Sequence, residues 1–184
     1  MWYRLLIILL FTGLMGCGNS DDPKPEPDLY TGTATAMVNG DEWNARVYFR
    51  EGTNTDNFTL GIAMHVHNEI GYKRESLAFS NVRPVFSSQL VKSQLDNPTD
   101  DIESLYTTFV ADGDAVAENY VPDTQINDHQ FQFTSINNET GEISGTFQVT
   151  LLLRVSTGDD RNPPESLTFV SGSFTAIGKT SWFD

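Results

Sequence analysis

The sequence has very little cysteine, few basic residues and no long apolar run. Cys17 is the only cysteine among the 184 residues, so no disulfide can form within the chain. Lys and Arg number 11 against 25 Asp and Glu, which gives a formal net charge of −14. Binding to nucleic acid requires a basic patch that contacts phosphates, and this charge balance excludes it. The apolar runs are shorter than the about 20 residues of a membrane-spanning helix.

Familiar catalytic motifs are also missing. The sequence has no Gly-x-Ser-x-Gly motif, no His-Glu-x-x-His motif and no glycine-rich phosphate loop. Only three histidines are present as acid–base groups near neutral pH or as strong metal ligands. We therefore expect a non-catalytic binding or accessory domain, with a glycan or a protein as its ligand. The alternatives are a hydrolytic enzyme whose carboxylates meet from different strands, and a structural subunit of a surface assembly.

The N-terminal residues have the features of an export signal. Arg4 precedes the apolar run Leu5–Phe11, and a small residue precedes the cysteine. The sequence Leu14-Met15-Gly16-Cys17 resembles the lipobox of bacterial lipoproteins, in which the cysteine is lipidated and becomes the first mature residue. This resemblance implies that residues 1–16 are a signal peptide and that Cys17 carries a lipid that contacts a membrane.

Residues 17–30 are predicted to be the lipidated cysteine and a flexible, acidic tether. Three prolines alternate with other residues, and positions 18–28 contain no large apolar side chain that could be buried. Ser20-Asp21-Asp22 resembles the acidic signal that directs Bacteroidota lipoproteins to the outer face of the outer membrane, although a generic acidic linker has the same composition. We expect a lipid-anchored outer-membrane protein that is exposed at the cell surface.

From Thr31 onward, apolar and polar residues alternate with the period of two that is typical of half-buried strands. The clearest apolar rows are Trp43/Ala45/Val47/Phe49, Phe58/Leu60/Ile62/Met64/Val66 and Ile143/Gly145/Phe147/Val149/Leu151/Leu153/Val155. No segment has a sustained helical pattern, and only Ser87–Leu95 has room for one or two helical turns. We predict that residues 31–184 form one all-β domain of about 8–9 antiparallel strands, folded as a β-sandwich or a small β-barrel.

Turn residues separate these rows. Asn39-Gly40 predicts a tight hairpin because both residues accept positive φ, and Asn137–Gly141 predicts a second hairpin. Thr157–Glu165 contains two prolines and predicts a long loop before the last strand. In that strand the parity of the apolar residues changes around Ser171-Gly172, which predicts a β-bulge.

Aromatic residues allow two interpretations. Trp43 begins an apolar row directly after the first turn, so we predict that it is buried against the strand Ile143–Val155. The alternative is an exposed tryptophan at a ligand site. Four tyrosines are either platforms for sugar stacking or ordinary strand formers; they are Tyr48, Tyr72, Tyr106 and Tyr120.

A pair of histidines is the first candidate metal site. His65 and His67 are two residues apart on a predicted strand, so they share the face opposite the apolar row. They would hold a metal if His129 or a carboxylate reached them from another strand. The alternative is two exposed histidines on the polar face.

Acidic residues suggest calcium as the only candidate cofactor. Asp112, Asp114 and Glu118 offer hard oxygen ligands within seven residues. Their spacing does not match an EF-hand loop. The alternative, which we favour, is solvated loop charge without a cofactor, since such charge keeps an acidic protein soluble.

Two motifs resemble a known family. Val38-Asn39-Gly40, followed by Trp43 and Ala45, looks like the V-N-G-x-x-W-x-A opening of small Bacteroidota outer-membrane lipoprotein domains of unknown function. The segments Gly141–Phe147 and Val170–Phe174 are similar to the closing half of these domains. The resemblance covers Thr31 to about Ile177 and implies a β-fold. The family has no established activity to assign to any residue here.

Overall fold

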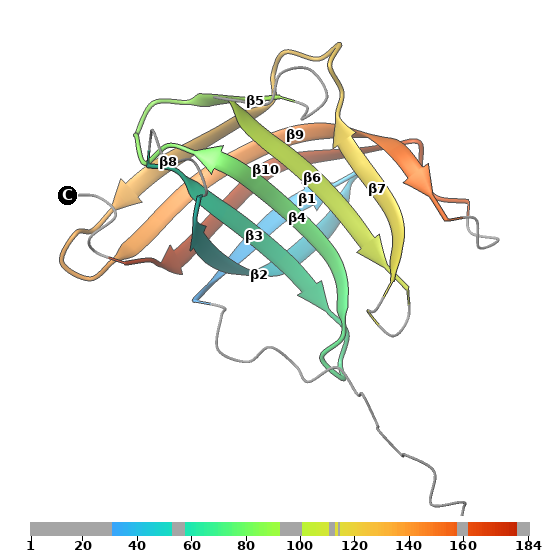
Figure 1. The fold of residues 1–184 in the computed structure, drawn as a ribbon, viewed down its shortest axis with the longest axis horizontal. Coiled ribbons are helices and arrows are strands. Elements are labelled where there is room, and N and C mark those ends of the chain that lie inside the picture. The colour runs from blue at the N-terminus through green and yellow to red at the C-terminus, as the bar shows by residue number, and fades with distance from the viewer. Residues whose placement is uncertain are drawn as a thin grey trace, which may run out of the picture.

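Ten β-strands form the structure, which is a computed structural model (Figure 1). It describes residues 31–52, 58–92, 101–110, 113, 115–157 and 162–179, and these ranges contain no helix. The predicted signal peptide, Cys17 and the tether lie outside the described residues. The strands are β1 (Gly32–Val38), β2 (Asp41–Glu51), β3 (Leu60–His67), β4 (Lys73–Val82), β5 (Gln89–Lys92), β6 (Ile102–Phe109), β7 (Val116–Pro122), β8 (Gln130–Ile136), β9 (Glu142–Ser156) and β10 (Ser166–Ile177).

The strands pair into one sheet that closes on itself as a barrel (Figure 1). Strands β10, β1, β2, β3, β4 and β6 follow one another, and two routes lead from β6 back to β9 and β10. At one end β7 pairs with both β6 and β9. At the other end β5 and β8 fill the same gap. The all-β prediction is confirmed. Because the sheet closes on itself, the fold is a small barrel rather than a sandwich, the other predicted architecture.

Two details of the predicted topology are wrong. The described residues form ten strands rather than about eight or nine, and β5 pairs with β6 in parallel, so the sheet is mixed and not purely antiparallel. The segment with room for a helical turn contains β5 instead, because its short backbone completes the gap between β6 and β8. β7 was also missed, since Glu118 faces the barrel interior at a position where the sequence pattern would require an apolar residue.

Both predicted hairpins are confirmed. Asn39 and Gly40 join β1 to β2 with φ values of 51° and 98°. The Asn39 carboxamide also links the turn to β10, because its Oδ1 accepts from Thr168 N at 2.9 Å and its Nδ2 donates to Ser166 O at 3.0 Å. Asn137–Gly141 joins β8 to β9, where Asn137 Oδ1 accepts two backbone N–H bonds.

The predicted bulge in β10 is also confirmed. Its register against β9 jumps between Phe169 and Gly172, and Ser171 has a φ of 54°. The one extra residue in β10 reverses the parity of the strand, so Phe169 and Phe174 both point into the barrel despite their odd spacing. The bulge therefore preserves the core on both sides of the irregularity.

Aromatic rings fill the barrel interior. Trp43 is 7% exposed and makes edge-on contacts with Phe147 of β9 and Phe169 of β10, at centroid distances of 6.5 and 5.3 Å. The prediction that Trp43 is a core residue against the Ile143–Val155 strand is confirmed. Ring contacts connect further buried side chains, which are Phe79, Tyr106, Tyr120, Phe131, Phe133 and Phe174.

Replacing Gly172 by alanine is expected to destabilise the barrel by about 1–3 kcal/mol, the usual cost of overpacking a core. An added Cβ would lie 2.6 Å from two ring carbons and from the backbone oxygen of Phe147, so β9 or β10 would have to shift. Thermal melting of Gly172→Ala should show the loss, with the exposed Ser173→Ala as a control. Equal melting of the two variants would contradict this packing.

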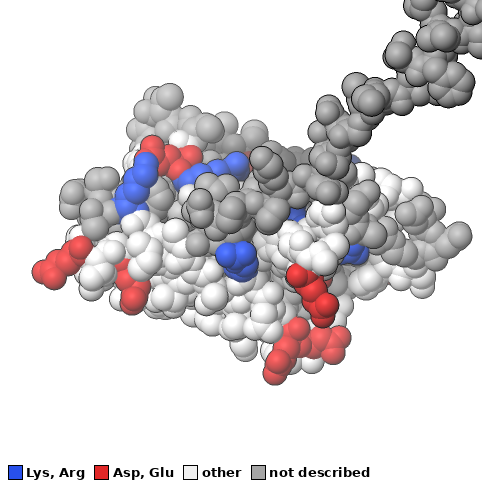
Figure 2. Space-filling view, turned by 90° about the horizontal axis from the view of Figure 1, so that it is seen from below, with Lys and Arg blue, Asp and Glu red and all other residues white. Residues whose placement is uncertain are grey.

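The outer surface carries charges of both signs. Figure 2 shows one side of the barrel, where uncharged residues cover much of the described surface and basic and acidic side chains are interspersed. Two ion pairs within the described ranges join Lys92 to Asp101 and Lys179 to Glu51, at 2.6 and 2.7 Å. The part of the chain that the structure describes contains no helix with the length and apolar character needed to cross a membrane.

Candidate functional site

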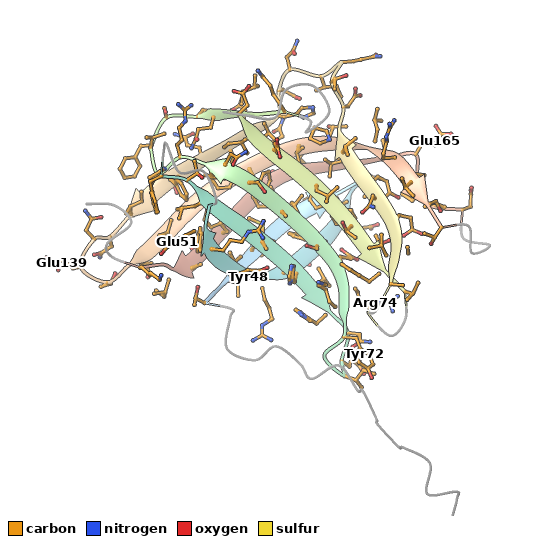
Figure 3. All side chains as sticks on the ribbon, in the orientation of Figure 1. Tyr48, Glu51, Tyr72, Arg74, Glu139 and Glu165 are labelled. Atoms are coloured by element: carbon orange, nitrogen blue, oxygen red, sulfur yellow. The ribbon has the colours of Figure 1, made fainter. Side chains whose placement is uncertain are left out.

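A polar groove on the outer surface of β8, β9 and β10 is the strongest candidate site. It encloses about 260 Å³ and runs beside β9, whose two ends lie near Glu139 and Glu165 in Figure 3. Its lining consists of amide and hydroxyl side chains with one aromatic residue and one glycine: Gln130, Gln132, Thr146, Phe147, Gln148, Ser171, Gly172 and Ser173. None of these side chains is charged, which distinguishes the groove from the acidic composition of the chain.

The β10 bulge creates one wall of this groove. Ser171 and Ser173 are exposed on either side of Gly172, which faces the interior. The positive φ of Ser171 turns the strand away from its regular path, and the register against β9 is interrupted there. The local backbone geometry that the sequence predicts therefore also shapes the candidate site.

Two cross-strand pairs form the opposite wall. Gln130 lies opposite Gln148, and Gln132 lies opposite Thr146, so amide and hydroxyl groups from β8 and β9 stand next to one another. Gln148 Nε2 donates to Asp128 Oδ2 at 3.0 Å, which fixes the orientation of its carboxamide. The wall therefore presents oriented polar groups.

The loop between β4 and β5 is attached to the groove. Gln132 Nε2 donates to the backbone oxygen of Phe86 at 2.8 Å, and Ser88 Oγ donates to Gln130 Oε1 at 3.2 Å. The buried Gln89 carboxamide closes the loop by bonding both N and O of Arg83, at 3.0 and 2.8 Å. These bonds hold the backbone of Phe86 against Gln132 at the edge of the groove, and Phe86 is 55% exposed.

The predicted histidine pair does not form a metal site with any described third ligand. His65 and His67 do share the outward face of β3, with ring centroids 6.1 Å apart. The described residues contain no group of three His, Cys, Asp or Glu side chains able to hold a metal ion. The alternative of two exposed histidines is wrong for His65, which is 5% exposed and contacts the ring of Tyr48 at 5.2 Å.

Burial changes the chemistry of His65. Desolvation, with smaller contributions from Lys73 and His67, lowers the pKa of His65 to about 3. The imidazole is therefore neutral over the physiological pH range. His65 therefore carries no positive charge at neutral pH and cannot act as an imidazolium acid there.

His129 serves the fold and does not approach the histidine pair. Its Nδ1 accepts from Thr150 N at 3.2 Å, which places the ring proton on Nε2, and Nε2 donates to Asp123 O at 2.7 Å. With both nitrogens bonded and 2% exposure, it joins the start of β8 to β9. It also lines a smaller hollow of about 130 Å³ beside β5.

The candidate calcium ligands are only partly described. Asp112 and Asp114 lie outside the described residues. Glu118 is 6% exposed and points into the barrel, where its carboxylate accepts from Thr108 Oγ1. Its backbone N in turn donates to Thr108 Oγ1 at 3.1 Å. Glu118 is therefore part of the barrel interior and not of a solvated loop, contrary to the alternative interpretation.

Sequence reasoning missed a polar cluster at this end of the interior. Trp43 Nε1 donates to Glu75 Oε2 at 2.7 Å, and the Tyr106 phenol also bonds to Glu75. Burial, then the carboxylates of Glu75 and Glu118, raise the pKa of Tyr106 far above its usual value. Two glutamates from different strands thus face the same phenol. The one sequence signal was that Glu75 and Glu118 interrupt the apolar rows of β4 and β7 at inward-facing positions.

The tyrosines do not form a common stacking platform. Tyr106 and Tyr120 are core residues, 5% and 1% exposed, and Tyr120 donates to Pro164 O at 3.1 Å. Tyr48 and Tyr72 are half-buried and lie apart on the barrel, with Tyr72 at the β3–β4 hairpin (Figure 3). An exposed aromatic residue whose backbone bonds a groove side chain is Phe86, which the sequence pattern did not single out.

Comparison with known proteins gives no match to any family model, curated protein or solved structure.

Proposed function

We propose that this protein is a lipid-anchored, surface-exposed outer-membrane lipoprotein whose barrel is a non-catalytic binding or accessory domain. The lipobox-like sequence ending at Cys17 and the acidic tether support the anchoring. The V-N-G-x-x-W-x-A and Gly141–Phe147 motifs support membership of the small Bacteroidota lipoprotein domains of unknown function.

One observation supports a binding function above the others. The interior of the barrel is filled by buried aromatic and aliphatic side chains, so ligand recognition falls to the outside. There, β8–β10 hold a groove with oriented carboxamides and hydroxyls, and such convergent polar groups are typical of binding sites. The groove contains no nucleophile with an adjacent base, which favours binding over catalysis.

Metabolic labelling tests the anchor. Wild-type protein in its native host is expected to incorporate labelled palmitate, and Cys17→Ala is expected to incorporate none, because the thiol is the acceptor. Ser20→Ala keeps the thiol and serves as the matched control. Equal labelling of wild type and Cys17→Ala would refute lipidation at this position. Protease treatment of intact cells then measures surface exposure.

A hydrolytic enzyme is the second candidate, and the Glu75–Glu118 cluster is the observation that favours it. Glu75 of β4 bonds the Tyr106 phenol and Glu118 of β7 lies near it, so carboxylates from two different strands face one phenol within the barrel, as the enzyme alternative requires. Turnover of a glycoside or ester by the full chain that disappears in Glu75→Gln, with unchanged melting, would replace the binding proposal. Turnover that survives Glu75→Gln and Glu118→Gln would exclude this cluster.

A further inference from the structure

We propose that the groove on β8–β10 binds a neutral saccharide, with its glutamines contacting hydroxyl groups and Phe86 covering an apolar face of the sugar. This inference rests on the proposed function of the barrel as a binding domain. It adds the chemical class of the ligand and the residues that recognise it.

The lining of the groove selects uncharged, hydroxyl-rich ligands. A carboxamide offers an acceptor and two donors side by side, which matches the adjacent hydroxyls of a sugar, each both donor and acceptor. No charged side chain lines the groove, so an anionic or cationic ligand would find no counter-charge there. Asp128 at the rim and the net charge of −14 further disfavour acidic saccharides.

The hydrogen bonds of the three glutamines determine which of their atoms face a ligand. Gln132 and Gln148 use their Nε2 atoms on Phe86 O and Asp128, so each has its Oε1 to offer as an acceptor. Gln130 accepts at its Oε1 from Ser88 and has its Nε2 to offer as a donor. Because these bonds fix the carboxamides before a ligand arrives, little side-chain entropy is lost on binding.

Phe86 supplies the apolar part of the site. It is 55% exposed and Val85 next to it is 39% exposed, while its backbone is bonded to the groove glutamine Gln132. Saccharide rings have apolar C–H faces, and covering one with an aromatic ring removes apolar surface of both from water. An exposed aromatic next to uncharged amides is thus a reason to choose a saccharide over a purely polar solute.

The size of the groove limits how much of a saccharide can bind in it. Its volume of about 260 Å³ is below the roughly 300–1,000 Å³ of typical ligand pockets. We therefore infer that one sugar unit occupies the groove while the rest of the ligand lies over the barrel surface. Oligosaccharides are the appropriate probes, because they extend beyond the single unit.

The experiment is calorimetric titration of the full chain in mild detergent with a panel of neutral oligosaccharides of glucose, galactose, mannose and xylose. Polygalacturonate is the acidic counterpart. At least one neutral oligosaccharide is expected to bind, with Kd raised at least tenfold in both Gln132→Ala and Phe86→Ala. The matched controls are Gln125→Ala and Phe58→Ala, which remove exposed residues that do not line the groove. Their Kd values are expected to stay within twofold of wild type.

Each contrary outcome overturns the inference. Binding of none of the neutral oligosaccharides, or of polygalacturonate alone, refutes the ligand class. If the Kd values of Gln132→Ala and Phe86→Ala stay within twofold of wild type, the groove is refuted as the binding site. If Gln132→Ala lowers melting, Gln130→Ala takes its place in the comparison. Palmitate labelling and surface exposure are measured separately, so failure of the saccharide leaves the proposed anchoring and surface location standing, and their failure is recognised independently.

Discussion

Trp43→Ala is expected to lower the free energy of unfolding by about 3–5 kcal/mol, the typical cost of removing a buried tryptophan. That is a large fraction of the about 5–15 kcal/mol that stabilises a typical domain. The indole lies between Phe147 and Phe169, so its removal leaves a cavity between β2 and the β9–β10 pair. It also removes the donor that bonds Glu75 inside the barrel. Urea denaturation followed by circular dichroism measures the loss.

Two further variants separate packing from hydrogen bonding. Trp43→Phe keeps an aromatic ring and removes the Nε1 donor, so it should cost clearly less than alanine but more than a surface change. Phe58→Ala removes a ring that is 45% exposed and should leave stability nearly unchanged. A Trp43→Ala protein as stable as Phe58→Ala would show that the aromatic interior does not depend on Trp43.

Acidification is expected to destabilise the wild type through His65. The folded pKa of about 3 lies below the ordinary value of 6.5, so below pH 6.5 the unfolded chain binds a proton that the folded chain does not. Stability from this group is therefore fully present above pH 6.5 and falls as pH drops towards 3, with a slope of about 1.4 kcal/mol per pH unit.

Comparing how steeply the unfolding free energy falls with pH in wild type and in histidine variants separates the contribution of His65 from that of the carboxylates. Stability measured in urea at pH 7, 6, 5 and 4 should fall less steeply for His65→Gln than for wild type. His67→Gln should keep most of the wild-type slope, because it leaves the buried imidazole of His65 in place. Parallel curves for wild type and His65→Gln would mean that His65 titrates normally in the folded state.

Alternation predicted those strands whose side chains obey a simple inside–outside rule. The rows around Trp43 and Ile143 are strands of the barrel, and the Asn39-Gly40 turn and the Ser171-Gly172 bulge are where the residue types require them. β5 could not be predicted, because four residues are too few to show a period. β7 was hidden by register shifts and by the inward-facing Glu118.

The candidate site was less accessible to sequence reasoning. Outward-facing glutamines on β8 and β9 look like ordinary surface residues, and the groove forms only when the β10 bulge is placed beside them. The sequence showed two glutamines two residues apart, Gln130 and Gln132, but nothing in it placed them near the Ser171-Gly172 bulge, because β9 lies between β8 and β10. Conversely, the histidine spacing gave the correct shared face for His65 and His67 but not the burial of His65, which depends on tertiary packing.

Closure of the barrel between the first and last strands has a consequence for how the protein is made. β1 pairs with β10, and Thr31 Oγ1 donates to Ile177 O, 146 residues further along the chain. A contact at this sequence separation forms late, because the entropy of closing so long a loop must be overcome first. The ring cannot be completed until synthesis has passed Ile177, so the closed barrel forms only after the last strand has been made. An export machinery that threads extended polypeptides would therefore meet a chain that has not yet locked into its final form.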